Sequence, residues 1–171
     1  LAIDVGTGSV RAALVRHRDG SVEAFRNRTH QGFALHHGWS EQRPADWWAG
    51  VVATVREVLA AVPDASARIA AVAACGQMHG TVLLDDAGAL VRDAAPLWND
   101  KRAQALVDAY RSSHRAEDYL AATGNPPAAP WPAFKLQWFR EHEPDTYRRT
   151  ACVLMPKDWV NFQLTGVRGF D

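Results

Sequence analysis

The chain has 171 residues, of which 47% are hydrophobic and 22% charged, the ordinary composition of a globular domain with a real core. Nineteen basic and nineteen acidic side chains cancel, which argues against a general nucleic-acid or anionic-membrane binder. The apolar runs are too short to cross a bilayer, no secretory-signal pattern is visible, and two cysteines make no disulfide framework, so we expect a reducing, cytoplasmic setting.

The first thirty residues predict an antiparallel meander of three strands. Residues 1–5 and 10–15 are apolar, strand-like runs on either side of a tight loop at 6–9. Asp19-Gly20 is a strong hairpin signal, and residues 21–28 supply the third strand.

Residues 44–62 give the clearest helix. Pro44 suits the first helical turn and Asp46 favours the helix dipole. Apolar side chains recur at three- and four-residue spacing, which predicts one buried face: Trp47, Trp48, Val51, Val52, Val55, Val58, Leu59 and Val62. We therefore assign the tryptophan pair to packing rather than to a cofactor site.

Short strands and helices alternate over the rest of the chain. Strands are expected at 69–74 and from 81, and helices at 100–111, 117–123, 133–142 and 156–164, the last ended by Gly166. The proline-rich residues 124–132 are expected to form an ordered loop or a linker. A meander followed by alternating helix and strand predicts an α/β fold.

Residues 4–11 have the composition of a metal–phosphate site. Gly6 and Gly8 let backbone N–H groups converge on an anion, and Thr7, Ser9 and Arg11 add hydroxyl donors and a positive charge. Asp4 would repel a phosphate unless Mg²⁺ lies between them, usually through water. The segment is neither a Walker A loop nor a Rossmann fingerprint, and an ordinary hairpin with turn chemistry stays an equal alternative.

Residues 76–80 form a glycine-flanked polar turn between two expected strands. Gly76 and Gly80 permit conformations and close approaches that a β-carbon would block. Gln77 and His79 offer donors and acceptors, and Met78 a deformable apolar wall. On these residues alone, a plain turn with a satisfied histidine is the simpler interpretation.

Set in order along the chain, the motifs resemble those of the FGGY carbohydrate kinase family. Residues 4–11 resemble the first phosphate-binding hairpin of the sugar-kinase, actin and heat-shock chaperone ATPase superfamily, and residues 76–80 the sugar-binding turn of the xylulokinases within the family. Further matches follow in family order, at residues 96–102, 123–125, 135–138 and 154–159 with 164–166. Arg11 departs from the xylulokinase pattern, where lysine is commoner.

The resemblance implies a ribonuclease H-like α/β fold of the actin/hexokinase ATPase type, with a mixed sheet flanked by helices. Family members are two-domain, ATP-dependent kinases with the active site in the cleft. Residues 1–171 would be part of the N-terminal, sugar-binding domain, with the nucleotide-binding domain and the catalytic aspartate beyond Asp171. The lack of an initiator Met agrees with a piece of a longer protein.

The resemblance also implies roles for individual residues. Asp4 would organise Mg²⁺, and Arg11 would help stabilise phosphate charge. Gly6, Thr7, Gly8 and Ser9 would face the γ-phosphate of ATP. The sugar would contact a second set: Gln77, Met78, His79, Trp98, Asn99 and Asp100. For Asp100, pairing with Arg102 or Lys101 as scaffold is an equal alternative. We expect Asp158 to cap its helix and Cys75 to pack beside the turn rather than react.

The resemblance therefore implies an ATP-dependent ketose kinase, converting D-xylulose to D-xylulose 5-phosphate, with this piece inactive alone. Another ketose or polyol stays open as the substrate. Two other classes compete: a non-catalytic, sugar-binding regulatory relative, and an actin- or chaperone-like ATPase module, against which the Met78-His79 pair argues. The expected partners are a small sugar and the rest of the chain, with no nucleic acid or membrane; a homodimer stays open.

Overall fold

The computed structural model describes residues 1–169, and the chain divides into two units. Unit 1 comprises residues 1–32, 43–78 and 154–171, and unit 2 comprises residues 33–42 and 79–153. The chain therefore passes from one unit to the other four times, and each unit is assembled from separate stretches of sequence. The expectation of a catalytic aspartate beyond Asp171 lies outside the described residues.

Unit 1 is built on a four-stranded mixed sheet in the order β3-β2-β1-β5. The strands are β1 (Ala2–Val5), β2 (Ser9–Val15), β3 (Val22–Thr29) and β5 (Ala73–Gly76). β1, β2 and β3 form the predicted antiparallel meander, and β5 pairs with β1 in parallel, from Ala2↔Ala73 to Val5↔Gly76. The prediction of a mixed sheet is confirmed.

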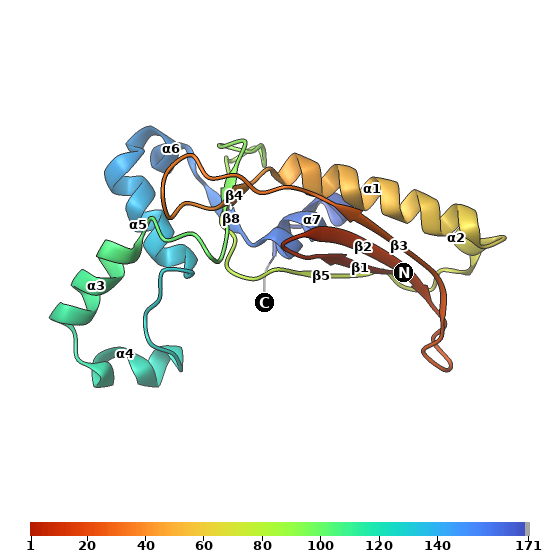
Figure 1. Ribbon diagram of the computed structural model, residues 1–171, viewed down its shortest axis with the longest axis horizontal. Coiled ribbons are helices and arrows are strands. Elements are labelled where there is room, and N and C mark those ends of the chain that lie inside the picture. Colours follow the sequence, from red (N-terminus) through yellow and green to blue (C-terminus); the bar gives the residue numbers. More distant parts are fainter. Residues whose placement is uncertain (170–171) are drawn as a thin grey trace. The chain divides into compact units, whose positions relative to one another are not determined.

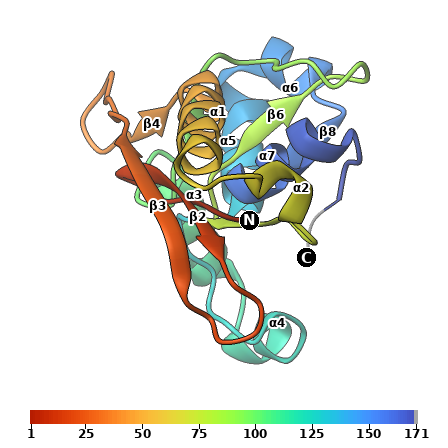
Figure 2. The same cartoon turned by 90° about the vertical axis from the view of Figure 1, so that its right-hand side faces the viewer.

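Helices α1 (Pro44–Ala61) and α7 (Pro156–Thr165) pack on this sheet, with the short α2 (Ala65–Arg68) after α1. α1 runs along the meander, and Figure 2 shows it nearly end-on beside β2 and β3 (Figures 1 and 2). Its apolar face supplies Val58 to a core with Leu14 and Ala24. Trp47 is fully buried and meets Trp159 of α7 edge to face, with ring centroids 6.3 Å apart. The packing role expected for Trp47 is confirmed.

The strand expected at residues 69–74 lies further along the chain, at Ala73–Gly76. The ladder with β1 starts only at Ala73, so residues 69–72 stay outside it. Ile69 instead packs against the α1 core. Residues 70–73 are exposed, so a short apolar run does not by itself fix where a strand begins.

The described residues of unit 2 form four helices and short strands that pair two by two. Its strands are β4 (Glu41–Gln42) paired with β7 (Ala95–Pro96), and β6 (Val82–Leu84) beside β8 (Cys152–Leu154), whose last residue falls in unit 1. Its helices are α3 (Gln104–Ser113), α4 (Ala116–Thr123), α5 (Pro132–His142) and α6 (Pro144–Arg149). A core of Ala103, Val107, Ala129 and Phe134 joins α3, α5 and the loop before α5. Residues 124–131 are thus an ordered loop, as one alternative predicted.

Candidate functional site

Two loops leave the same edge of the unit 1 sheet, because β1 and β5 are parallel neighbours and both end there. The loop after β1 carries Thr7, and the turn after β5 carries Gln77. The Gln77 N–H donates to the carbonyl oxygen of Val5 at 2.9 Å, and the Thr7 hydroxyl donates to Gln77 Oε1 at 3.2 Å. The predicted phosphate loop and the start of the predicted sugar turn, 70 residues apart in sequence, are therefore hydrogen-bonded to each other.

Asp4 and Arg11 face each other across β1 and β2, as their register requires. Arg11 Nη1 lies 2.7 Å from Asp4 Oδ2, and both side chains remain partly exposed, at 48% for Arg11 and 35% for Asp4. A carboxylate and a guanidinium thus stand together at the base of the glycine loop. Such a pair can act on a phosphate–metal complex from the same side, Arg11 on the phosphate and Asp4 on the metal.

A single carboxylate fits Mg²⁺ that keeps most of its water and shares oxygens of a nucleotide, which is the usual binding mode of this ion. It does not fit an all-protein metal cage. Within residues 1–169, no group of three or more His, Cys, Asp or Glu side chains could hold a metal ion. Asp4 is therefore a plausible oxygen ligand, directly or through water, for a metal that arrives with its nucleotide.

The loop between β1 and β2 is braced from within unit 1. The Gly6 N–H donates to the carbonyl of Ser9 at 3.0 Å, which closes the tight turn, and Ser9 is buried. His30, which the sequence gave no reason to single out, donates its backbone N–H to the carbonyl of Gly8 and places Nε2 3.1 Å from the carbonyl oxygen of Thr7. Burial lowers the pKa of His30, against the opposing effect of its bonds to Thr7 and Gly6. A neutral His30 thus holds the loop in place.

In the turn after β5, the glycines were expected to take the unusual backbone conformation, but another residue takes it. The left-handed φ of +61° falls on His79, and neither Gly76 nor Gly80 has a positive φ. Gly76 is required instead for close approach, since a β-carbon there would lie 2.6 Å from the carbonyl oxygen of Val5. Gln77 is buried, whereas Met78 is 63% exposed as the apolar wall of a binding turn would be.

The chain passes from unit 1 to unit 2 between Met78 and His79. In unit 2 His79 lines a hollow of about 620 Å³, together with a set of residues from the proline-rich loop and the start of α5: Thr123, Asn125, Pro126, Ala128, Trp131, Pro132 and Ala133. The pKa of His79 is lowered, first by desolvation and second by the positive charge of Lys135. A neutral imidazole can both donate to and accept from sugar hydroxyl groups.

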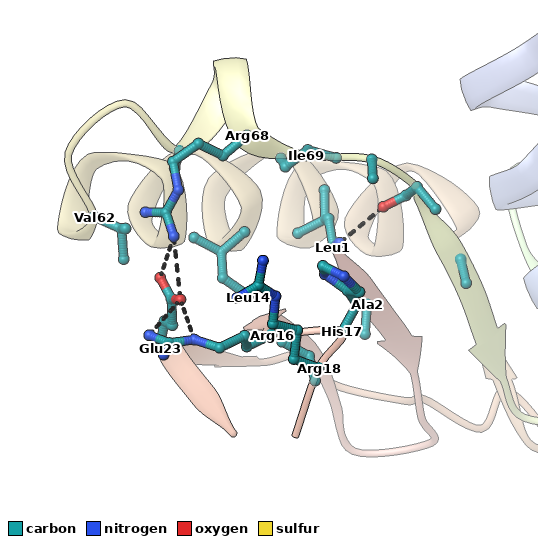
Figure 3. A pocket seen from close by; sticks show the side chains of 15 residues that line it. Leu1, Ala2, Leu14, Arg16, His17, Arg18, Glu23, Val62, Arg68 and Ile69 are labelled. Carbon is teal, nitrogen blue, oxygen red and sulfur yellow. Dashed lines mark hydrogen bonds and ion pairs between the residues drawn. The ribbon is translucent and has the colours of Figure 1, made fainter. Parts of the chain in front are cut away.

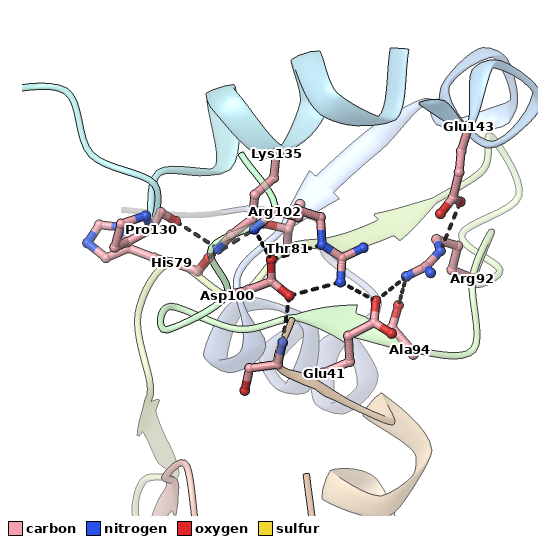
Figure 4. A network of polar contacts seen from close by, with 11 residues as sticks. Glu41, His79, Thr81, Arg92, Ala94, Asp100, Arg102, Pro130, Lys135 and Glu143 are labelled. Carbon is pink, nitrogen blue, oxygen red and sulfur yellow. Dashed lines mark hydrogen bonds and ion pairs between the residues drawn. The ribbon is translucent and has the colours of Figure 1, made fainter. Parts of the chain in front are cut away.

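Asp100 is buried within a polar network of unit 2 (Figure 4). Its carboxylate accepts from Arg102 Nε and Nη2, each at 2.9 Å, and from the backbone N–H of Ser40 at 2.7 Å. Arg102 also binds Glu41 at 2.7 Å. The predicted pairing of Asp100 with Arg102 is confirmed, and it accounts for the burial of Asp100; a contact to sugar stays a prediction.

The neighbours of Asp100 in the same motif are placed differently. Trp98 is 46% exposed and Asn99 is exposed, so both side chains are accessible to a ligand. Arg102 lies between aromatic rings, with Cζ 3.8 Å from the ring centroid of Trp39 and 5.0 Å from that of Trp138. The buried residues of this motif, Asp100 and Arg102, therefore support its exposed residues, Trp98 and Asn99.

Two smaller expectations have different outcomes. Asp158 is buried and accepts from the backbone N–H of Met155 at 3.3 Å, which confirms its role as a cap of α7. Cys75 is exposed, so the expectation that it packs beside the turn is wrong. Its position opposite Asp4 on the edge strand β5 leaves it uncovered in unit 1. Desolvation and the nearby Asp4 raise the pKa of Cys75, which disfavours the reactive thiolate.

A second hollow, of about 780 Å³, lies in unit 1 where β1 begins and β2 ends (Figure 3). Arg16 and Arg68 both pair with Glu23 on its wall, and Leu14 and Val62 line its apolar part. None of the residues predicted to bind nucleotide or sugar lines it. Since the phosphate loop leaves the opposite end of β1, the larger hollow and the predicted chemistry are separate features of unit 1.

The comparison with known families agrees with this arrangement. Residues 1–171 match the model of the FGGY family of carbohydrate kinases, N-terminal domain. The chain therefore belongs to the FGGY family of carbohydrate kinases. No helix among residues 1–169 is both long and apolar enough to span a membrane.

Similar proteins carry a more particular name. The chain is 34% identical over 168 residues to the xylulose kinase of Bacillus subtilis (strain 168), and 35% identical over 170 residues to that of Escherichia coli (strain K12). These alignments cover 98% and 97% of this chain and 33% of each relative. The chain thus spans about a third of the length of the curated relatives that it matches.

Solved structures show the same fold. The crystal structure of xylulose kinase from Rhodospirillum rubrum matches with a TM-score of 0.92 at 34% identity, over 99% of this chain and 35% of that one. The structure of a xylulose kinase from Brucella ovis matches with a TM-score of 0.89 at 32% identity, over 96% of this chain and 34% of that one. The predicted fold, α/β of the ribonuclease H-like, actin/hexokinase ATPase type, is confirmed.

Proposed function

We propose that the complete protein is an ATP-dependent ketose kinase that converts D-xylulose to D-xylulose 5-phosphate. The observation that carries the proposal is the hydrogen bond from Thr7 to Gln77, because it joins a phosphate-type loop to a sugar-type turn at one edge of one sheet. The relatives named xylulose kinase, at 34% and 35% identity, support the choice of substrate.

Transfer of a phosphoryl group depends on positioning and charge stabilisation. In this proposal the loop of Gly6, Thr7, Gly8 and Ser9 lies against the γ-phosphate of ATP, and Arg11 offsets its charge. Asp4 holds Mg²⁺, which neutralises phosphate charge when it is bound. The partly exposed Asp4–Arg11 pair is open to both groups.

The sugar contacts come from the turn after β5 and from the motif around Asp100. Met78 presents an exposed apolar surface and His79 a neutral imidazole, suited to the C–H and O–H groups of a ketose. Trp98 adds an exposed ring for an apolar sugar face, with Asn99 beside it. Residues 1–171 form part of the sugar-binding domain, and the nucleotide-binding domain and proton acceptor lie beyond Asp171.

An ADP-release screen of the full-length protein over a panel of ketoses and polyols tests the proposal. We expect the highest kcat/KM with D-xylulose, with the product identified as D-xylulose 5-phosphate by mass and by NMR. A preference for another ketose would overturn the substrate while keeping the kinase. Saturable sugar binding without any ADP release would replace the kinase with a sugar-binding regulatory protein.

A further inference from the structure

We propose that Lys135 is a positioning residue that sets the sugar-binding geometry of His79, an inference that rests on the proposed function. Lys135 belongs to the sequence motif at residues 135–138, in which it has no role assigned so far. In the structure its side chain is fully buried in unit 2, and its ammonium group reaches the turn that carries His79. Figure 4 shows the side chain extending from α5 toward that turn.

Lys135 makes two hydrogen bonds to backbone carbonyl groups. Its Nζ donates to the carbonyl oxygen of His79 at 2.7 Å and to that of Pro130 at 2.8 Å. His79 has φ of +61°, a conformation that a residue with a β-carbon adopts only when its surroundings hold it there. The bond from Lys135 to the carbonyl of this same residue supplies such a restraint.

The two carbonyl groups that accept from Lys135 belong to segments that line the hollow in unit 2. His79 lines this hollow, and so do Ala128, two residues before Pro130, and Trp131, directly after it, from the proline-rich loop. One buried ammonium group therefore fixes both the residue proposed to contact sugar and the loop beside it. Loss of Lys135 would release both walls of the hollow together.

The surroundings of Lys135 also set its protonation. Burial lowers the pKa of Lys135 to about 7, opposed by the carboxylate of Asp100 and assisted by Arg102. A neutral amine retains two N–H groups, enough to donate to both carbonyl oxygens, so the two bonds survive deprotonation. The charge of protonated Lys135 is one of the two causes that lower the pKa of His79, so Lys135 also favours the neutral imidazole.

A double-mutant cycle in the full-length protein tests the inference. Lys135→Met should raise the KM for D-xylulose by roughly tenfold to a hundredfold, the scale of a misplaced binding group, with kcat and the KM for ATP little changed. His79→Ala should raise the same KM. Because Lys135 acts through His79, the double variant should be no worse than His79→Ala alone.

Arg92→Met is the matched control, because it also removes a cation of unit 2 that is largely buried, one that pairs with Glu41 and Glu143 and not with the His79 turn. We expect it to lower the thermal midpoint without changing the KM for sugar. Additive effects of Lys135→Met and His79→Ala, or an equal rise in KM in Arg92→Met, would overturn the inference. If Lys135→Met does not fold, Lys135→Gln, which keeps an amide donor, replaces it in the cycle.

A titration that needs no turnover separates this inference from the proposed function. Histidine-labelled full-length protein, with the His79 signal assigned from its loss in His79→Ala, gives the pKa of His79 by NMR. We expect that pKa to rise in Lys135→Met and to stay unchanged in Arg92→Met. An unchanged pKa in Lys135→Met would overturn the inference, whereas a wild-type protein that phosphorylates no ketose would overturn only the proposed function.

Discussion

At position 76 the backbones of β1 and β5 leave no room for a side chain. A β-carbon there would lie 2.6 Å from the carbonyl oxygen of Val5, the atom that accepts the hydrogen bond from Gln77. Gly76→Ala should therefore push the predicted sugar turn away from the sheet. We expect a loss of about 1–3 kcal/mol in the free energy of unfolding, the usual cost of overpacking, measured by urea denaturation.

Gly8→Ala is the matched control for stability at this edge. A β-carbon at Gly8 would have no heavy atom within 4 Å, and its φ is not positive. The free energy of unfolding should stay within about 0.5 kcal/mol of wild type. Equal destabilisation by both substitutions would show that glycine at position 76 is not needed for close approach.

Substitutions of Asp4 and of His79 should change different kinetic parameters. Their proposed partners differ, Mg²⁺ with ATP for Asp4 and the ketose for His79. Asp4→Ala should lower kcat by roughly a hundredfold or more, because it removes charge organisation in the transition state. His79→Ala should mainly raise the KM for sugar. Steady-state kinetics with each substrate varied in turn measures both.

Glu23→Ala provides the control for Asp4→Ala. Glu23 of β3 also pairs with an arginine, Arg16 just past the end of β2, at 2.9 Å, but at the far end from the phosphate loop. Its loss should leave both kinetic parameters unchanged, because Glu23 lies away from the residues proposed to contact phosphate, metal or sugar. Wild-type kinetics in both Asp4→Ala and His79→Ala would contradict the assigned roles.

Among the elements, the short strands β4 and β7 depend on a buried ionic network. Glu41 of β4 binds Arg102, which also binds Asp100, and all three are buried. Removing one partner of a buried network leaves its charges uncompensated, at a cost of about 3–5 kcal/mol. Arg102→Met should therefore lower the unfolding midpoint sharply, as measured by thermal denaturation.

The exposed ion pair of Arg148 with Asp145 on α6 is the comparison for Arg102. Arg148→Met should barely move the midpoint, because water already screens that pair. If Arg102→Met is as stable as Arg148→Met, then aromatic packing around position 102 rather than charge pairing holds β4 and β7 in place.

On α5, the buried Lys135 makes stability depend on pH. Its pKa falls from 10.5 to about 7 in the folded state. Between these values the unfolded chain binds a proton that the folded chain lacks, so stability rises with pH across this window and is lost as pH falls toward 7. The free energy of unfolding of wild type, relative to that of Lys135→Met, should increase from pH 7 to pH 9, by up to about 1.4 kcal/mol per pH unit.

Urea denaturation at pH 7 and at pH 9 measures this change. Lys101→Met, which removes an exposed lysine of the same unit, serves as the control and should differ from wild type by the same amount at both values. A constant difference between wild type and Lys135→Met would show that Lys135 keeps its proton throughout.

Elements with a clear apolar periodicity, or with a turn sequence at their ends, could be predicted from the sequence. The apolar stripe of α1 and the Asp19-Gly20 turn are local signals, and both elements formed as predicted. β4 and β7 could not be found, because each has two residues and exists only through its pairing with the other. α6, with the sequence Pro-Asp-Thr-Tyr-Arg-Arg, was missed because it shows no apolar period.

The candidate site divides in the same way. The composition of residues 4–11 and 76–80 pointed to two binding loops, but only the parallel pairing of β1 with β5 brings Thr7 to Gln77. Lys135 and His30 act on backbone carbonyl groups of distant segments. Such contacts leave no local pattern, so sequence reasoning about side chains alone could not assign their roles.

At the scale of the whole molecule, the interleaved units constrain what the chain can do by itself. Unit 1 includes α7, from the last part of the chain, and packs it against strands from the first. The sheet of unit 1 supplies the phosphate-type loop. The relatives of the chain that are named xylulose kinase are about three times as long as the chain. Under the proposed function, the proton acceptor and the adenosine site would belong to that remaining length.

We therefore expect the 171-residue chain alone to form no sugar phosphate from ATP and any ketose. Its loops can place charge beside a phosphate, but nothing in the proposed arrangement of residues 1–169 takes the proton from the attacking hydroxyl. Mass detection of sugar phosphate after prolonged incubation measures this, with full-length protein as the positive control and the folded state of the short chain verified by circular dichroism. Sugar phosphate from the short chain would place a proton acceptor within residues 1–171, and His79, the neutral imidazole on the sugar turn, would become the first residue to test for that role.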